Sequence, residues 1–155
     1  MEERNIRQGV SYSVLKLARR YMELDGCVHN YGTNVSIYHS EIHLVSAIAR
    51  NPGIHVRGLA ERMGVASASV SETVRKLEKK GLVRKEISPD NQSRLSLYLT
   101  KKGELAHEEH TRYHKILEHI VEDALSDASD AQVEFITTFF ADLLKRMDGF
   151  EDMIQ

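Results

Sequence analysis

The chain is poor in cysteine and proline, and both shortages restrict what it can be. Its single cysteine, Cys27, cannot form an internal disulfide, which is typical of proteins kept in a reducing compartment. Only two prolines occur and no Ser/Gly-rich tract is present, so no linker between domains is evident. The sequence also lacks an apolar run of about eighteen residues and an apolar signal segment at its start. We therefore expect a one-domain cytoplasmic protein that does not enter a membrane.

The net charge of −2 is unevenly distributed over the 155 residues. Residues 55–102 contain 11 Lys and Arg against 5 Asp and Glu, a net charge of +6. The rest of the chain contains 10 Lys and Arg against 18 Asp and Glu, a net charge of −8. A basic middle between acidic ends indicates that the middle meets a polyanion while the ends serve another purpose.

Hydrophobic periodicity predicts a mainly α-helical chain with one short β-hairpin. We expect helices over about residues 8–26, 40–50, 56–63, 67–80, 101–124 and 129–148. The segments GLVRKEI and SRLSLYLT are expected to be strands, joined by the turn SPDNQ. Pro52, in the segment NPG, prevents the second helix from continuing. The last helix is apolar on two flanks, which favours packing both on its own domain and on a partner.

The segment HVRGLAERMGVASASVSETVRKLEKKGLV, residues 55–83, fits a helix-turn-helix. Gly64 supplies the turn, where a positive φ costs glycine little. The second helix would bury Val70, Val74 and Leu77 and present small polar and basic residues to a DNA major groove. The hairpin would form a wing, with Arg84, Lys85 and Arg94 near the phosphates. The residues predicted to contact DNA are Ser67, Ala68, Ser71, Glu72, Arg75, Lys76, Lys79, Arg84 and Arg94. The alternative is a helical hairpin and a β-hairpin with a charged surface.

The segments NPGIHVRGLAERMGV, SVSETVRKLEKKGLV and LYLTKKG resemble the MarR family of winged-helix regulators, and the resemblance extends over nearly the whole chain. It implies a single MarR-like domain over residues 1–155, with a winged helix-turn-helix DNA-binding lobe at residues 36–100. Dimerisation helices would lie at residues 1–35 and 101–155. The resemblance also implies a homodimer that binds a pseudo-palindromic operator in double-stranded DNA, acting as a repressor under the control of a small effector.

The sequence departs from the family pattern at two places. Relatives usually carry an Asp-x-Arg in the wing, with the arginine reaching the minor groove. Here those positions are Asn91, Gln92 and Ser93, and Arg94 comes one residue late. Glu72 stands where many relatives have a basic residue, and it is placed to accept a hydrogen bond from a cytosine amino group or to exclude other bases.

Histidines gather in the segment HEEHTRYH, residues 107–114. In a helix, His107, His110 and His114 share one face. His39 and His43 form a second pair four residues apart. Two such imidazoles can bind one metal ion, and ligands from another helix complete a tetrahedron. Zinc suits a set of histidines and carboxylates, and copper or nickel would also bind. The alternative is that these imidazoles are satisfied by carbonyl groups or water.

Glu109, His110 and His114 match a Glu-His-x3-His motif of zinc-dependent repressors of zinc-uptake genes within the MarR family, the AdcR and ZitR type. This resemblance implies that Zn²⁺ is bound by His110, His114, His43 and a carboxylate of either Glu23 or Asp25. Those relatives also have a second, weaker site formed by a cysteine and two glutamates, for which the candidates here are Cys27, Glu41 and Glu109. His107 has no place in the motif, so it is the internal control among the three histidines.

Three alternatives stay open from the sequence. A MarR-type sensor of phenolic or other apolar anions would line its cleft with Tyr12, Tyr21, Tyr31, Tyr38 and His43. A peroxide sensor would act through Cys27, but a nearby aspartate and no nearby Lys or Arg disfavour a reactive thiolate. A zinc hydrolase is disfavoured because the histidines of HEEH are three apart, whereas H-E-x-x-H needs four. We therefore do not expect an enzyme.

Overall fold

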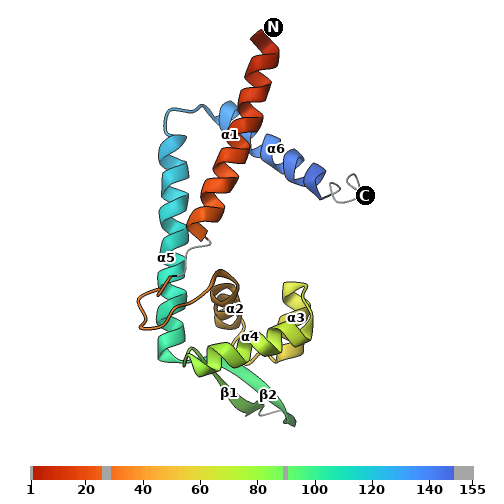
Figure 1. The fold of residues 1–155 in the computed structure, drawn as a ribbon, viewed down its shortest axis with the longest axis vertical. Coiled ribbons are helices and arrows are strands. Elements are labelled where there is room, and N and C mark those ends of the chain that lie inside the picture. Colours follow the sequence, from red (N-terminus) through yellow and green to blue (C-terminus); the bar gives the residue numbers. More distant parts are fainter. Residues whose placement is uncertain (1, 26–28, 89–90, 149–155) are drawn as a thin grey trace. The chain divides into compact units, whose positions relative to one another are not determined.

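The computed structural model describes residues 2–25, 29–88 and 91–148 and is mainly α-helical, with one two-stranded sheet (Figure 1). In chain order the elements are α1 (Glu2–Asp25), α2 (His39–Ala49), α3 (Val56–Met63), α4 (Ser67–Lys79), β1 (Val83–Ser88), β2 (Asn91–Leu99), α5 (Lys101–Ala124) and α6 (Asp130–Met147). The predicted fold class, mainly α with a small β-wing, is confirmed. The chain forms two units, Met1–Arg112 and Tyr113–Gln155, and α5 belongs to both.

Two predicted boundaries are wrong. Helix α1 begins at Glu2 and not near residue 8, because the polar residues at its start favour helix without showing apolar periodicity. The predicted turn SPDNQ is too long, since Ser88 ends β1 and Asn91 begins β2. The antiparallel ladder continues to the pair Ser88 and Asn91, with a register shift after Ile87. Strand pairing therefore extends into residues whose composition is typical of a turn.

The core of the first unit lies between α2, α3, α4 and the hairpin. Helix α2 contributes the largest share, because four apolar residues in eleven point inward. The hydrophobic side chains buried here are Ile37, Ile42, Leu44, Val45, Ile48, Leu59, Ala60, Val70, Val74, Leu77, Leu82, Val83, Leu97 and Ala106. Each fully buried Val, Leu or Ile stabilises the fold by about 1.5–3 kcal/mol. The helix-turn-helix is thus anchored on α2 and on the base of the hairpin.

Helix α5 begins against the corner where α4 passes into β1. Thr100 caps its first turn, since its hydroxyl accepts a hydrogen bond from the Gly103 N–H at 3.1 Å and donates to the Gly81 carbonyl at 2.6 Å. Gly103 lies directly on the Leu82 carbonyl, where a Cβ would overlap the oxygen. The start of α5 is therefore fixed to the end of the helix-turn-helix.

The second unit contains the C-terminal half of α5 and helix α6. Ser129 precedes α6, and its backbone N–H donates to Gln132 Oε1 at 2.8 Å, closing a capping box. None of the described residues of α6 is buried. Large apolar side chains are exposed here, namely Ile116, Ile120, Val121, Phe135, Phe140, Leu144 and Met147. Among the helices of the described part of the chain, none has the length and apolar character needed to cross a membrane.

Candidate DNA-binding face and histidine cluster

The predicted helix-turn-helix is present in the first unit. Helix α3 ends at Gly64, which adopts the left-handed conformation with φ 65°, and α4 begins three residues later. Val70, Val74 and Leu77 are buried on the inner side of α4, as the sequence predicted. The residues predicted to face DNA lie on its outer side. Ser71 is half-buried, and the exposed ones are Ser67, Ala68, Glu72, Arg75, Lys76 and Lys79.

The charges on the outer side of α4 are partly paired with one another. Lys76 Nζ lies 2.8 Å from Glu72 Oε1, and both side chains are well exposed. The hydrogen bond and the attraction between them lower the pKa of Glu72 and raise the pKa of Lys76. Glu72 therefore stays ionised at neutral pH and neutralises one of the two lysines of this face.

The wing contains further ion pairs. The Arg84 guanidinium pairs with Glu86 and lies 5.0 Å from the centre of the Tyr98 ring. Lys85 Nζ lies 2.7 Å from Glu78 on α4, so the base of the wing is tied to the second helix of the helix-turn-helix. The side chain of Arg94, the remaining predicted wing contact, lies outside the described part. Arg84 is thus exposed on β1, and Figure 1 shows the hairpin beside α4.

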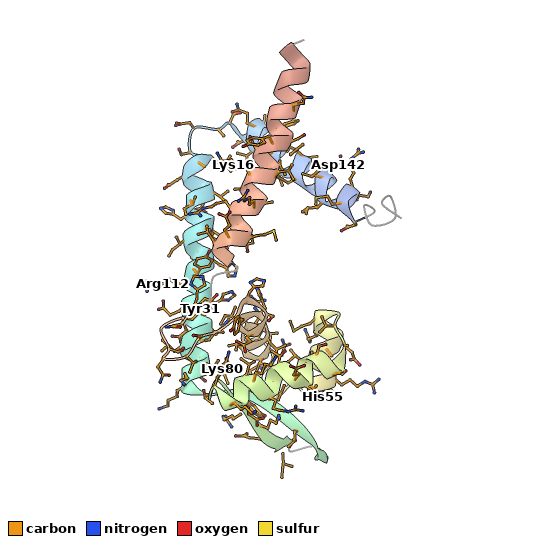
Figure 2. The ribbon with its side chains drawn as sticks, in the orientation of Figure 1. Lys16, Tyr31, His55, Lys80, Arg112 and Asp142 are labelled. Carbon is orange, nitrogen blue, oxygen red and sulfur yellow. The ribbon has the colours of Figure 1, made fainter. Side chains whose placement is uncertain are left out.

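Imidazole and phenol rings from three parts of the first unit form a histidine cluster, which we define as His39, His43, His110 and Tyr31. The ring centroids of His39 and His43 lie 4.2 Å apart, and those of His43 and His110 lie 5.2 Å apart. Tyr31 packs edge-on against His110 at 5.6 Å, and its place beside α2 and α5 is labelled in Figure 2. His110 is only 5% exposed. His43 and His110, two of the three histidines predicted to bind a metal, are therefore close together, and His110 lies in the interior.

Ser46 connects the histidine cluster to His107. Its Oγ lies 3.1 Å from Nδ1 of His110 and 3.1 Å from Nδ1 of His107. A hydroxyl donates one hydrogen, so Ser46 donates to one ring and accepts from the other, and the two imidazoles carry opposite tautomers when both are neutral. Burial, and then the charge of Arg50, lower the pKa of His107. His107 shares a hydrogen-bond partner with His110, so it is not the independent control that the sequence predicted.

The predicted carboxylate ligands contact basic residues. Glu23 pairs with Arg19 at 3.0 Å and with Arg20 at 3.3 Å. The Glu109 carboxylate lies 3.4 Å from Arg112. Glu41 is 4% exposed and pairs with Lys80. Cys27 and the side chain of Asp25 lie outside the described residues.

His114 belongs to the second unit, where its ring lies 6.2 Å from that of Tyr113. Within the ranges that the structure describes, no three His, Cys, Asp or Glu side chains are already arranged to hold a metal ion. The histidine cluster therefore brings imidazole nitrogens together, but among the described residues it does not form a complete metal site.

Two contacts were missed from the sequence, the Ser46 bridge and the pair of Glu41 with Lys80. Their partners are 64 and 39 residues apart in the chain, and neither serine nor glutamate interrupts the helical pattern of α2. No signal in the sequence would have identified them, because the contacts depend on how α2 packs against α4 and α5.

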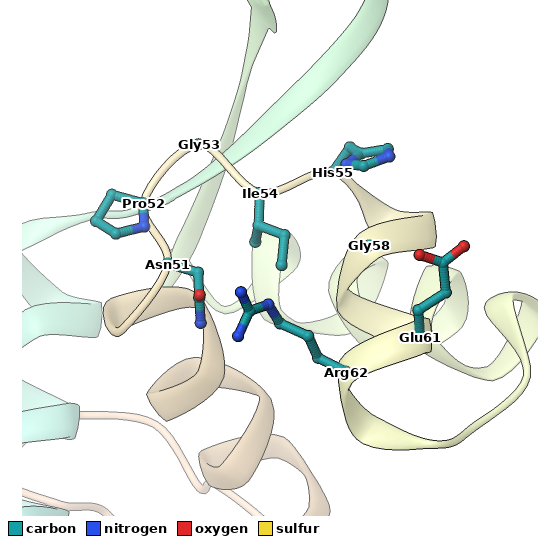
Figure 3. A pocket seen from close by; sticks show the side chains of 8 residues that line it. All are labelled: Asn51, Pro52, Gly53, Ile54, His55, Gly58, Glu61 and Arg62. Atoms are coloured by element: carbon teal, nitrogen blue, oxygen red, sulfur yellow. The ribbon is translucent and has the colours of Figure 1, made fainter.

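A pocket between the end of α2 and helix α3 contains none of the predicted site residues. It is lined by Asn51, Pro52, Gly53, Ile54, His55, Gly58, Glu61 and Arg62. In Figure 3 the Arg62 side chain extends from α3 toward the α2–α3 loop. The His55 ring lies so close to Gly58 that an added Cβ would stand 2.9 Å from Cε1. Gly58 thus allows the His55 ring to lie against α3.

Two short helices joined through a left-handed glycine, followed by an antiparallel hairpin, define a winged helix-turn-helix protein. Residues 37–93, which run from just before α2 into β2, match the model of the MarR family. That family and the relatives below are transcriptional regulators and not enzymes, which confirms the prediction from the sequence. Over 116 residues the chain is 27% identical to the uncharacterized HTH-type transcriptional regulator YhjH of Bacillus subtilis (strain 168). The match covers 75% of this chain and 66% of that relative, just under two thirds of its length.

Two solved structures share the fold. FabT of Streptococcus pneumoniae, solved in complex with DNA, has a TM-score of 0.73 at 21% identity, over 93% of this chain and 99% of that one. ZitR of Lactococcus lactis, described as a zinc-responsive MarR family member, has a TM-score of 0.70 at 15% identity, over 89% of this chain and 99% of that one. At these identities the likeness establishes the fold alone.

Proposed function

We propose that the chain is a cytoplasmic, homodimeric MarR-family repressor that binds a pseudo-palindromic operator in double-stranded DNA. Residues 36–100 form the DNA-binding lobe, and residues 1–35 and 101–155 supply the dimer contacts. Helix α4 enters the major groove, and the wing lies over the adjacent backbone. The observation that carries the proposal is the outer face of α4, where small side chains and exposed cations follow a left-handed turn at Gly64.

The contacts of this face divide into two kinds. Arg75, in the middle of α4, has the length and donor geometry to read a guanine edge through two hydrogen bonds. Lys76 and Lys79 supply positive charge to phosphates and position the helix. Ser67, Ala68 and Ser71 are small enough to let the start of α4 approach the bases closely. Structural neighbours solved with DNA, such as FabT, support this use of the fold.

The test begins by selecting a duplex from randomised DNA with the wild-type protein. Arg75→Ala should then lower the affinity for the selected duplex by about 1–3 kcal/mol and relax the base preference at one position. Arg146→Ala is the control, since it removes an equal charge from an exposed site on α6. Failure of the wild type to enrich any sequence, or an Arg75→Ala variant that behaves like the control, would contradict the proposal.

For the effector, we propose Zn²⁺ bound by His43, His110 and His114 with a carboxylate from Glu23 or Asp25. The spacing of His43 and His110 supports this choice. With Zn–N bonds of about 2.0–2.1 Å and tetrahedral angles, the centroids of two ligating imidazoles lie roughly 5 Å apart. Those of His43 and His110 are 5.2 Å apart. His114 follows His110 by four residues on α5, the spacing at which two imidazoles share one ion.

Ser46 contributes to this proposed site from outside the ligand set. When His110 donates its Nδ1–H to Ser46, its Nε2 carries the lone pair that a metal requires. Glu23 would have to exchange its contacts with Arg19 and Arg20 for the metal. Since the ligands come from separate helices, Zn²⁺ would favour one arrangement of these helices and so shift the protein toward one DNA-binding state. The second, weaker site of Cys27, Glu41 and Glu109 stays a prediction.

Elemental analysis of protein purified without a histidine tag, with DNA binding measured in zinc and in chelator, tests the metal proposal. His110→Ala and His114→Ala should lose zinc and the zinc response. His119→Ala is the matched control, because His119 is an exposed histidine of the same helix whose ring lies near two carboxylates. Zinc-dependent binding should also weaken in acid, since protonated imidazoles do not ligate. Equal binding in zinc and chelator would exclude zinc control.

A phenolic or other apolar anion is the second candidate effector, and one contact favours it. Tyr31 lies edge-on against His110, so an aromatic ligand would find both a ring and an imidazole there. The other tyrosines predicted to line the cleft, Tyr12, Tyr21 and Tyr38, are exposed in this chain. Salicylate is a suitable probe: a change in DNA affinity with salicylate and none with zinc would select this candidate.

A further inference from the structure

A largely buried ion pair joins helix α2 to the end of α4. Lys80 Nζ lies 2.7 Å from Glu41 Oε1 and 2.5 Å from Glu41 Oε2. The carboxylate side chain is 5% exposed and the lysine side chain 23%. Taking such charges out of water is costly unless each is paired and hydrogen-bonded. The pair therefore needs further partners to persist.

Both charged groups have such partners. Glu41 Oε2 accepts a hydrogen bond from the Tyr38 backbone N–H at 2.9 Å, at the first turn of α2. Lys80 Nζ donates to the Ser36 carbonyl at 2.8 Å and lies 5.0 Å from the centre of the Tyr38 ring. These contacts restrain the carboxylate and the ammonium in place, which makes the pair a rigid connection between α2 and α4.

The pair lies where α4 ends. Lys80 caps the C-terminus of α4, and its own carbonyl accepts a hydrogen bond from Lys102 Nζ at 2.9 Å. Gly81 follows in the left-handed conformation, φ 71°, and its carbonyl accepts from Thr100. The end of α4 is thus held by α2 through a charge pair and by the start of α5 through hydrogen bonds.

On α2, Glu41 stands between His39 and His43, two members of the histidine cluster. The backbone segment that carries the imidazoles therefore also carries the carboxylate that holds Lys80. A shift of the first turn of α2 moves the anchor of α4 with it. The ion pair therefore directly connects the helix turn that carries His39 and His43 with the end of α4.

We infer that Glu41 and Lys80 form the positioning contact that sets helix α4 for sequence-specific DNA binding, and that movements of the histidine cluster reach α4 through it. The inference rests on the proposed DNA-binding function. Glu41 would have to leave Lys80 to serve the predicted second metal site. Neither residue touches DNA in this account, because both act through the placement of α4.

The test compares three variants, Glu41→Gln, Lys80→Met and the double Glu41→Gln/Lys80→Met. The double variant is decisive, because removing both members of a buried ion pair leaves no unpaired charge and is often neutral for stability. We expect it to keep the melting temperature of the wild type. Its preference for the selected duplex over a scrambled one should fall about tenfold, within the usual range of coupling between sites. Each single variant should lose as much preference as the double.

The matched control is Arg57→Met/Glu61→Gln. It removes an exposed ion pair of 3.0 Å from α3, in the same lobe and with the same zero change in net charge. It should keep the wild-type preference. If zinc control holds in the wild type, the ratio of affinities in zinc and in chelator should shrink in the Glu41/Lys80 double variant and not in the control.

The outcomes separate the two proposals. If the wild type enriches no sequence from randomised DNA, the proposed function fails and the inference falls with it. If the wild type enriches a sequence and the folded double variant keeps the same preference as the control, the inference alone is overturned. A double variant with a wild-type melting temperature and a tenfold loss of preference supports it.

Discussion

Ser46 shows how one small side chain determines the chemistry of two larger ones. It is 3% exposed and occupies a position of α2 where the helical pattern alone would accept alanine. Because its single hydroxyl serves both His107 and His110, the proton on one ring determines the tautomer of the other. The nitrogen that His110 offers to any ligand therefore depends on His107. A change at either histidine affects both.

His107 should make the stability of the chain depend on pH. Burial and the Arg50 charge lower its pKa in the folded state, so the unfolded chain takes up the proton first as the pH falls. The stabilisation is present above the unfolded pKa of about 6.5 and is lost as the pH falls from there through the lower pKa of the folded state. Chemical denaturation in chelator should therefore show the wild type losing more free energy of unfolding between pH 7.5 and 5.5 than His107→Gln.

Arg50→Gln offers an independent check of this pH dependence. It removes the second cause of the pKa shift and leaves burial in place, so its pH profile should fall between those of the wild type and His107→Gln. Parallel profiles for the wild type and His107→Gln over this range would show that His107 does not contribute.

At the scale of elements, the close packing of α5 against the segment between α4 and β1 requires that residue 103 has no side chain, as in Gly103. A Cβ there would overlap the Leu82 carbonyl oxygen and approach Leu99 Cβ to 3.3 Å. Gly103→Ala should lower the free energy of unfolding by about 3 kcal/mol, because backbone on both sides must move. Gly9→Ala in α1 is the control. Its Cβ meets nothing within 4 Å, and the substitution should stabilise the helix by about 0.5–1 kcal/mol. Equal effects in thermal denaturation would contradict this account of the packing.

The salt dependence of DNA affinity tests whether helix α4 contacts phosphates. Lys79 is exposed near its C-terminal end, and neutralising one phosphate contributes about 0.9 to the slope of log affinity against log salt. Lys79→Ala should reduce that slope by roughly one and weaken selected and scrambled duplexes alike. Lys145→Ala, an exposed lysine of α6, should leave the slope unchanged. An unchanged slope in Lys79→Ala would remove this residue from the interface.

The elements could be predicted from the sequence where a local pattern determines them. The hydrophobic periodicity of α3, α4 and α5 predicted the positions of these helices closely. Gly64 marked the turn between α3 and α4, because glycine adopts a positive φ at little cost. The wing turn could not be delimited, because strand pairing between Ser88 and Asn91 overrides turn-like composition. The grouping of His43 with His110 was predicted through the resemblance, whereas the Ser46 bridge and the pair of Glu41 with Lys80 depend on packing between distant segments.

At the scale of the whole molecule, α1 and α6 each expose several large apolar side chains, a surface that often marks an interaction site. Tyr12 and Leu15 of α1 are both 69% exposed, and Phe135 and Leu144 of α6 are 70% and 64% exposed. Other apolar residues of α6 are less exposed, since Val133, Ile136, Phe139 and Leu143 are half-buried. The proposed dimer would cover such surfaces, and burying each large side chain contributes about 1.5–3 kcal/mol.

The dimer proposal predicts that the C-terminal helix is needed for assembly. Deleting residues 129–155 should leave a monomer or an aggregate, because the apolar surfaces of the rest of the chain lose their cover. The sharper variant is Phe140→Glu/Leu144→Glu, which places charge on two exposed positions that the single chain does not bury. Analytical ultracentrifugation should find it monomeric and helical, with weak DNA binding because a lone lobe reads only one half-site. Thr138→Glu, exposed on the same helix, should stay dimeric. A folded, monodisperse monomer that binds the selected duplex as tightly as the wild type would show that DNA binding does not require the dimer.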